Sequence, residues 1–199
     1  CGSLAARNQP RAPKFSGSIH EQRFMASQNR RAELNKTSAA EASEALLRRL
    51  QAMRAETLAL ADGLSDADAT AQSMADASPA KWHLGHTSWF FEALVLDPGH
   101  PGYQLFDDRF AYLFNSYYDS VGPRQPRPQR GLLTRPPLAD VIAYRHHVDA
   151  GLADLMGNGG ADEDLLNIIE LGLHHEQQHQ ELLLTDILHL FAQNPLKPA

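Results

Sequence analysis

The chain has 199 residues, of which 43% are hydrophobic, so it can bury one sizeable core and we expect a single folded domain. Its net charge of −6 argues against a general nucleic-acid binder, and no apolar run approaches the roughly 20 residues that span a bilayer. The one cysteine, Cys1, excludes a disulfide framework and a thiolate metal site; we expect a cytoplasmic protein that binds neither nucleic acid nor membranes.

Residues 1–36 differ in composition from the rest of the chain. They carry seven of the 18 Lys and Arg residues but two of the 24 Asp and Glu residues, and they show no helical or alternating pattern. Low hydrophobicity with a net charge predicts a disordered or loosely packed tail, and this tail lacks the apolar core of a secretory signal. We expect the folded domain at residues 37–199, a native start at Met25 and an upstream extension at residues 1–24.

Four long helices are predicted in residues 37–199. The first begins at Ser38, where Glu41 completes a capping box. The others are predicted over residues 79–96, 137–156 and 162–192, with Ser78 capping the second and Gly157 ending the third. No segment alternates as a strand would, so we expect an all-α fold: a four-helix bundle with a long crossover loop between the second and third helices.

Apolar residues recur at helical spacing within these segments. Those expected to be buried are Leu46, Leu50, Met53, Leu60 and Leu64 in the first helix and Leu138, Val141, Val148, Leu152 and Leu155 in the third. The inward stripe of the fourth helix is predicted to be Ile168, Gly172, His175, His179, Leu182 or Leu183, and Asp186.

Two histidines of the fourth helix are the strongest functional signal. His175 and His179 are four residues apart and project from one helix face, as two ligands of a metal site do. Together with Glu176 they match the zinc-protease pattern, in which the Glu acts as general base. That interpretation is weak, because the positions of the motif's Gly and of its third-ligand His hold Leu182 and Thr185. The version whose third ligand is a carboxylate on a following helix also fails, because Glu181 and Asp186 are expected on the same helix as the two histidines.

A third ligand must therefore come from upstream, and His86 is the best candidate. It shares one face of the second helix with Trp82, Trp89 and Ala93. A histidine on an apolar face is more often a hydrogen-bonded core residue than a ligand, and His83 could pair with it. The presence of two further inward histidines favours a ligand, and three neutral imidazoles suit Zn, Fe, Ni or Cu.

The connection at residues 97–136 has two parts. Aromatic residues crowd residues 103–118, where we expect a short helix, and prolines are expected to keep residues 120–131 extended. Arg124, Arg127 and Arg130 recur at three-residue spacing in this second part. Their guanidinium groups suit a carboxylate ligand, and the alternative is a solvated basic loop.

Three motifs, in this order, resemble the N-terminal DinB-like domain of the ergothioneine-biosynthesis sulfoxide synthases. They are the Ser-Pro-x-x-Trp-x-Leu-Gly-His helix of residues 78–86, the Phe-Asn-Ser-Tyr-Tyr-Asp loop of residues 114–119 leading to Arg124, and the His-x-x-x-His-x-Glu helix of residues 175–181. The similarity covers residues from about 38 to 199, including the ending at residues 186–196.

Those proteins are mononuclear non-heme iron enzymes. They use O2 to join a cysteine-type thiol, cysteine or gamma-glutamylcysteine, to hercynine and to oxidise the sulfur to a sulfoxide. The resemblance implies that this chain is the N-terminal half of such an oxidoreductase. It also implies that His86, His175 and His179 bind Fe(II), with Zn or Ni able to occupy the site in purified protein.

The same resemblance implies roles for residues around the metal. Gln178 matches a position near the hercynine site, and Arg124 and Arg127 match loop arginines that hold the carboxylates of the thiol substrate. Glu181 of the motif is expected to orient an imidazole through its second N–H.

The family enzymes continue into a second domain that resembles formylglycine-generating enzymes and supplies a catalytic tyrosine. That C-terminal domain is absent from this chain, so we expect the isolated chain to bind metal without forming the sulfoxide. The alternatives are a stand-alone DinB-like metal-binding protein, of thiol transferase or stress-response type, and a structural bundle with vestigial histidines. The arginine-bearing loop favours the sulfoxide synthase, because generic DinB-like proteins need no such loop.

Overall fold

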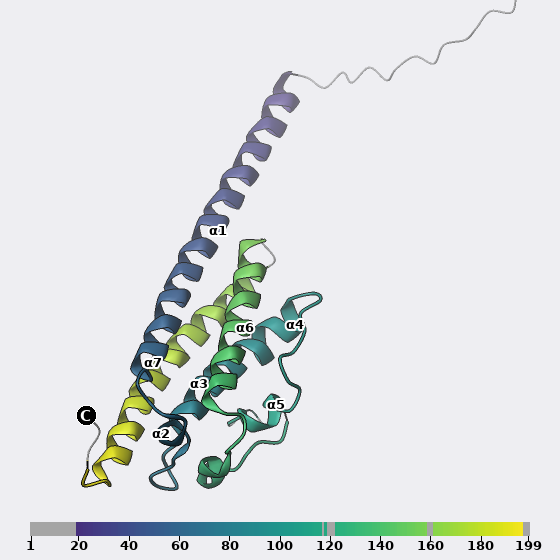
Figure 1. Cartoon of the computed structure of the whole chain (residues 1–199). Helices are drawn as coiled ribbons and strands as arrows, with labels where there is room; N and C mark the ends of the chain where they lie inside the picture. The colour runs from purple at the N-terminus through teal and green to yellow at the C-terminus, as the bar shows by residue number, and fades with distance from the viewer. Residues whose placement is uncertain (1–18, 117, 119–121, 159–160, 197–199) are drawn as a thin grey trace, which may run out of the picture. The chain divides into compact units, whose positions relative to one another are not determined.

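The computed structural model describes residues 19–116, 118, 122–158 and 161–196 (Figure 1). The chain divides into two compact units, the first ending at Ala39 and the second running from Ala40 to Ala199. Within the described residues every regular element is a helix and none is a strand, which confirms the all-α expectation. None of the described helices is long and apolar enough to cross a membrane.

Helix α1 (Ile19–Leu60) begins earlier than expected. We predicted a start at Ser38 and a loosely packed tail up to residue 36, but the chain is already helical from Ile19. The reason is composition, because the stretch up to Leu60 has no Pro or Gly and is rich in Ala, Glu, Arg and Gln, which are strong helix formers. Residues 1–18 of the predicted tail lie outside the described part of the chain.

The second half of α1 supplies one wall of the core. Leu46, Leu50 and Met53 are buried there as predicted, whereas Leu60 and Leu64 are only partly buried. A short helix, α2 (Asp66–Thr70), follows and is closed at its start by a capping box between Ser65 and Asp68.

Helix α3 (Ala80–Phe91) is the central element, and all 12 of its residues are buried. It continues as a π-helical turn, η1 (Glu92–Leu96), and a final turn, α4 (Asp97–Gly99). A helix that is enclosed on every side must have neighbours all round, and α3 packs against α6 (Leu138–Gly157) and α7 (Glu163–Ala192).

The start of α3 differs in detail from the prediction. Its N-cap is Pro79, which has no side chain to hydrogen-bond, and Ser78 does not cap the helix. The Ser78 N–H instead donates to Asp186 on α7 at 2.8 Å, and the Ser78 hydroxyl accepts a bond of 2.8 Å from Arg130. The Ser78 hydroxyl, which would otherwise cap α3, is thus engaged in a contact with a distant part of the chain.

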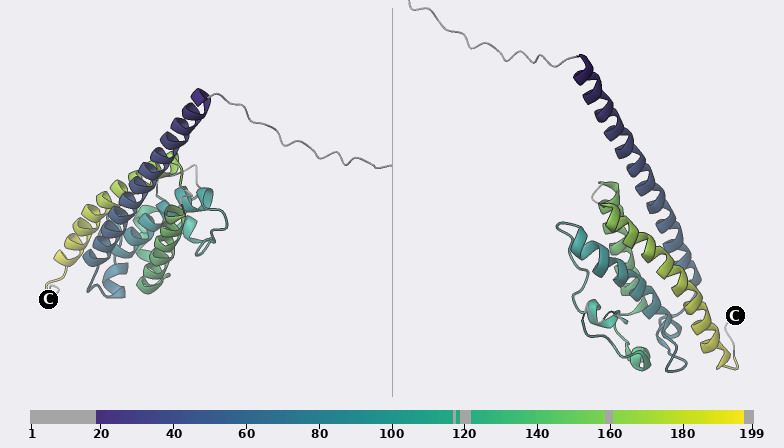
Figure 2. Two further views of the ribbon diagram at one scale, coloured as in Figure 1. Left: turned by 90° about the horizontal axis from the view of Figure 1, so that it is seen from above. Right: turned by 180° about the vertical axis from the view of Figure 1, so that it is seen from behind.

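Contacts between the helices fix their directions, which Figures 1 and 2 show. Ser78 at the start of α3 meets Asp186 near the end of α7, so these two helices are antiparallel. Arg49 and Arg54 of α1 bond in order to Glu170 and Glu176 of α7, so these two are parallel. The residues that will matter for function lie where α3 and α7 face each other.

The segment between α4 and α6 contains two short helices. Helix α5 (Phe110–Leu113) confirms the short helix expected among the aromatic residues. The second part is not extended throughout, because η2 (Arg127–Leu132) is a 3₁₀ helix with proline in its first turn. Proline lacks an N–H and has a helix-compatible φ, so it fits the first turn of a helix. Residues 117 and 119–121 of the predicted loop lie outside the described residues.

The last two helices lie close to their predicted bounds. Helix α6 ends at Gly157, and α7 begins after Asp162, whose carboxylate accepts the Leu165 N–H at 2.9 Å. The inward stripe of α7 needs small corrections, because Leu183 is buried and Leu182 is exposed, and the fully buried isoleucine is Ile169 and not Ile168.

Candidate metal centre

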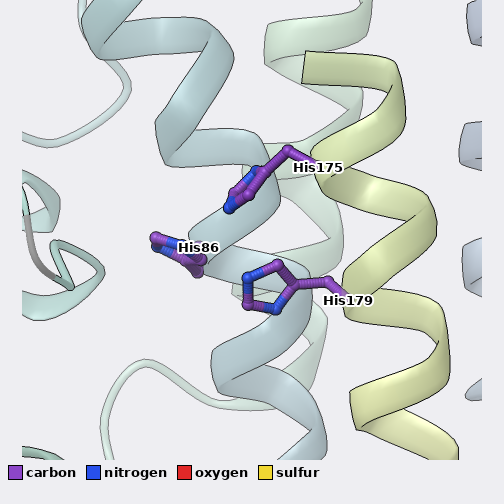
Figure 3. Close-up of side chains that lie close together, drawn as sticks. All are labelled: His86, His175 and His179. Carbon is purple, nitrogen blue, oxygen red and sulfur yellow. The ribbon is translucent and has the colours of Figure 1, made fainter. Parts of the chain in front are cut away.

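Three histidines meet between α3 and α7, and they are the three predicted metal ligands. His86 comes from α3, and His175 and His179 come from successive turns of α7; each offers a ring nitrogen, and these atoms lie within 4.8 Å of one another. Their rings point toward one another in Figure 3. His86 and His179 are buried and His175 is half-buried.

Two glycines allow the close packing around this cluster. A Cβ on Gly172 of α7 would lie 2.4 Å from the ring of Phe91, so only glycine lets α7 approach α3 this closely. On the other side, a Cβ on Gly85 would lie 2.3 Å from the ring of Phe114. Real Cβ atoms do not approach other heavy atoms to such distances, so both glycines are required by space and not by backbone conformation.

His86 is held in one orientation. Its Nδ1–H donates a hydrogen bond of 2.6 Å to the backbone carbonyl of Phe114, so in the neutral ring Nε2 carries no proton. Its ring is stacked between Trp82, at a centroid distance of 4.6 Å, and Trp89, at 5.5 Å. The predicted shared face of Trp82, His86 and Trp89 is therefore a stack that fixes the imidazole plane.

His179 is oriented by His83, which the sequence had suggested as a partner of His86. The Nδ1 of His83 lies 2.9 Å from Nδ1 of His179. The Nε2 of His83 lies 3.0 Å from the carboxylate of Asp186. Burial raises the pKa of Asp186, but the hydrogen bonds from His83 and Ser78 outweigh burial and hold the pKa below its ordinary value, so this residue is a carboxylate.

His175 has a buried nitrogen without a hydrogen bond. Its Nδ1 is enclosed and meets no partner in the described structure, and its ring lies 4.7 Å from that of Phe90. Buried polar atoms are nearly always satisfied, so an unsatisfied imidazole nitrogen beside two other imidazoles fits a metal ligand.

The electrostatics of the site keep all three rings neutral at pH 7. Burial lowers the pKa of His86 well below its usual range and lowers the pKa of His175 to about 4. Burial also lowers the pKa of His179, and the neighbouring histidines lower it further. Neutral imidazole is the form that binds a metal, so the donor set is ready for Fe, Zn, Ni or Cu without loss of protons.

The zinc-protease interpretation lacks its general base. Glu176 is fully buried, and its carboxylate is paired to Arg145 and, at 2.9 Å, to Arg54. Burial raises the pKa of Glu176, but the two guanidinium groups outweigh burial and hold the pKa below its usual range. This ion network was not predictable from the sequence, because arginines on helices are ordinarily exposed.

The residues predicted to bind substrate are not enclosed with the histidines. Gln178 and Arg124 are exposed. The Arg127 guanidinium donates to the backbone carbonyl of Asp76, and its charge contributes, after burial, to lowering the pKa of His83. Glu181, expected to orient an imidazole, lies on the exposed side of α7; Asp186, one turn further along the chain, takes that place through His83.

Arg130, the third arginine of the predicted basic loop, is not solvated. It is buried, its guanidinium lies 3.3 Å from the centroid of the Trp82 ring, and it donates to the Ser78 hydroxyl. It therefore joins η2 to the stack of rings that holds His86. The proline-rich sequence around Arg130 suggested an exposed loop, and it gave no indication that this side chain is buried.

A separate cavity of about 790 Å³ lies beside α5 and the start of α6. It is lined in part by Phe106, Tyr112 and Arg135, and none of the three clustered histidines contributes to its wall. The cavity is therefore distinct from the candidate metal centre.

Comparison with known proteins agrees with this arrangement. No curated protein matches the chain. The family model described as the DinB superfamily matches residues 49–183, a range that holds all three clustered histidines. Because this match spans more than half of the sequence, the chain belongs to the DinB superfamily.

Proposed function

We propose that this chain is the metal-binding domain of an iron-dependent sulfoxide synthase in ergothioneine biosynthesis, the enzyme family that its motifs resemble. The reaction joins a cysteine-type thiol to hercynine with O2. The observation that carries the proposal is the cluster of three neutral imidazoles, His86, His175 and His179, with a bare Nε2 on His86 and an unsatisfied Nδ1 on His175.

In this proposal the three histidines hold one iron ion. With three protein ligands, the ion would keep coordination positions that no protein group fills, and a thiol and dioxygen would bind there. The chain supplies rigidity: the Phe114 carbonyl and the two tryptophans fix His86, and Phe90 packs against His175. Preset ligand orientation lowers the reorganisation that metal binding and chemistry would otherwise require.

Substrate contacts are proposed for three polar residues. Gln178 follows His175 by three positions on α7 and would approach hercynine, and Arg124 and Arg127 would hold the thiol's carboxylate groups. The missing walls of such a pocket would come from a second, formylglycine-generating-enzyme-like domain. We also propose that α1, α3, α6 and α7 form a four-helix bundle with residues 97–136 as its crossover.

The alternative is a stand-alone DinB-like metal-binding protein, of thiol transferase or stress-response type. One observation favours it: Gln178 and Arg124 are exposed, and Arg127 already donates to a backbone carbonyl, so these three residues do not enclose a substrate pocket with the histidines. The two proposals share the metal centre and differ in substrate.

The deciding experiment extends the chain by the coding sequence that follows Ala199 and supplies Fe(II), hercynine, thiol and O2. Mass spectrometry should detect the sulfoxide conjugate from the extended protein, no product from the 199-residue chain, and no product from the extended His86→Ala variant. In this proposal both domains contribute groups that hold the two reactants together, and catalysis depends on that shared geometry. An extended protein that makes no sulfoxide but transfers thiols in an iron-dependent manner would replace this proposal with the alternative.

A further inference from the structure

A chain of hydrogen bonds leads from a carboxylate to one of the clustered histidines. Asp186 lies 3.0 Å from Nε2 of His83, and Nδ1 of His83 lies 2.9 Å from Nδ1 of His179. We propose that Asp186 and His83 are positioning residues that hold the proton of His179 on Nδ1, so that its Nε2 lone pair is free for the metal. The inference rests on the proposed metal centre and concerns the residues that orient one of its ligands.

The direction of the protons follows from the chemistry of each group. A carboxylate only accepts hydrogen bonds, so the proton between Asp186 and His83 lies on Nε2 of His83. A neutral imidazole has one N–H, so Nδ1 of His83 can only accept, and the donor to it is Nδ1–H of His179. The remaining nitrogen of His179, Nε2, then has no proton.

The reverse arrangement would prevent binding. If His83 donated from Nδ1, then His179 would carry its proton on Nε2, and that nitrogen could not coordinate a metal. The carboxylate of Asp186 decides between the two arrangements, because it can accept only the proton that His83 holds on Nε2.

The relay is enclosed and is built on the two ligand-bearing helices. The side chain of His83 is 3% exposed and that of Asp186 is 12% exposed, so water competes little for their hydrogen bonds. His83 lies on α3 with His86, and Asp186 lies on α7 with His179. The N–H of Ser78 adds a second bond to the same carboxylate oxygen at 2.8 Å, which holds Asp186 in place.

The first test reads the proton position in metal-free protein. Nitrogen-15 NMR of the histidine rings should show His179 protonated on Nδ1 in the wild-type chain. Asp186→Leu, which cannot accept a hydrogen bond from His83, should let His179 populate the Nε2-protonated form. Glu181→Gln removes a carboxylate from the exposed side of the same helix and should leave the ring signals unchanged. A wild-type His179 protonated on Nε2 would overturn the proposal.

The second test measures Co(II) affinity and the visible ligand-field spectrum of the same proteins. Loss of an outer partner of a metal-bound histidine costs about 10- to 100-fold in affinity, and we expect this loss for Asp186→Leu and none for Glu181→Gln. Unchanged affinity and spectrum in Asp186→Leu would overturn the proposal. A wild-type chain that binds no Co(II) would instead refute the metal centre, and the NMR result would still report on the relay.

Two variants of His83 guard against an Asp186 variant that does not fold. In His83→Gln the amide oxygen can accept from His179 and the amide nitrogen can donate to Asp186, so affinity should remain near that of the wild type. In His83→Phe neither bond is possible, and affinity should fall in a chain whose circular dichroism is unchanged. Equal Co(II) affinity in these two variants would contradict the relay.

Discussion

Arg145 of α6 and Glu176 of α7 form an ion pair in which neither side chain is exposed to solvent. Arg54 of α1 donates to the same carboxylate at 2.9 Å and also pairs with Asp149 of α6. One buried carboxylate thus joins three helices, at the residue that follows His175 in the chain. The position of that histidine therefore depends on a network that contributes no ligand.

Glu176→Gln should destabilise the fold strongly. The substitution keeps the shape but leaves buried Arg145 without its paired carboxylate, whereas Arg54 keeps Asp149; breaking a buried pair in this way typically costs about 3–5 kcal/mol in the free energy of unfolding. The matched control is Glu170→Gln, which breaks a pair with Arg49 whose side chains are 47% and 53% exposed and should cost less than about 1 kcal/mol. Urea unfolding followed by circular dichroism gives both values, and equal costs would contradict the buried network.

Gly85→Ala should weaken both the fold and the metal site. The new methyl group would overlap the buried ring of Phe114, and overpacking of this kind costs about 1–3 kcal/mol. Displacement of Phe114 also moves the carbonyl that fixes His86, so Co(II) affinity should fall. Gly157→Ala is the control, because its methyl group meets nothing within 4 Å at the end of α6. A Gly85→Ala protein with wild-type stability and affinity would show that the Phe114 contact is not needed.

Intrinsic fluorescence should report metal binding. The chain has two tryptophans, and both Trp82 and Trp89 stack on His86. Co(II) or Cu(II) held by that imidazole should quench their emission in proportion to occupancy, whereas Zn(II), which has a filled d shell, should quench it far less. His86→Ala should abolish the Co(II) response. Quenching that persists in that variant would place the ion elsewhere.

Stability of the metal-free chain should fall as the pH falls from about 6.5 toward 4. Burial lowers the pKa of folded His175 to about 4 from 6.5, the ordinary value for the unfolded chain. Between these values the unfolded state binds a proton that the folded state does not, so the slope is at most about 1.4 kcal/mol per pH unit for this residue. Unfolding curves in EDTA should show a shallower pH dependence for His175→Ala than for the wild type. Identical slopes would contradict a buried neutral His175.

Some of this structure follows from local sequence rules. The bounds of α7 were predictable because Asp162 caps a long periodic segment and no proline interrupts it. The start of α1 was not predictable from the capping pattern at Ser38, because that pattern lies inside a stretch whose residues favour helix throughout. A capping box indicates a helix start only where the preceding residues do not form helix themselves.

The site shows the same division between local and tertiary information. Spacing alone predicts that His175 and His179 share a face, and a histidine among tryptophans pointed to His86. The roles of Arg54, Arg145 and His83 depend on partners more than 30 residues away, and no local pattern records such contacts. One signal was overlooked: an aspartate on an inward stripe, Asp186, needs a buried partner.

The most direct test of the metal centre is elemental analysis after anaerobic loading with Fe(II) and removal of unbound metal. The wild-type chain should retain about one metal ion per chain, a stoichiometry set by one three-histidine site. His175→Ala should lose most of this metal, whereas His174→Ala, which removes the exposed neighbouring histidine, should retain it. Equal metal content in wild type and His175→Ala would contradict the account.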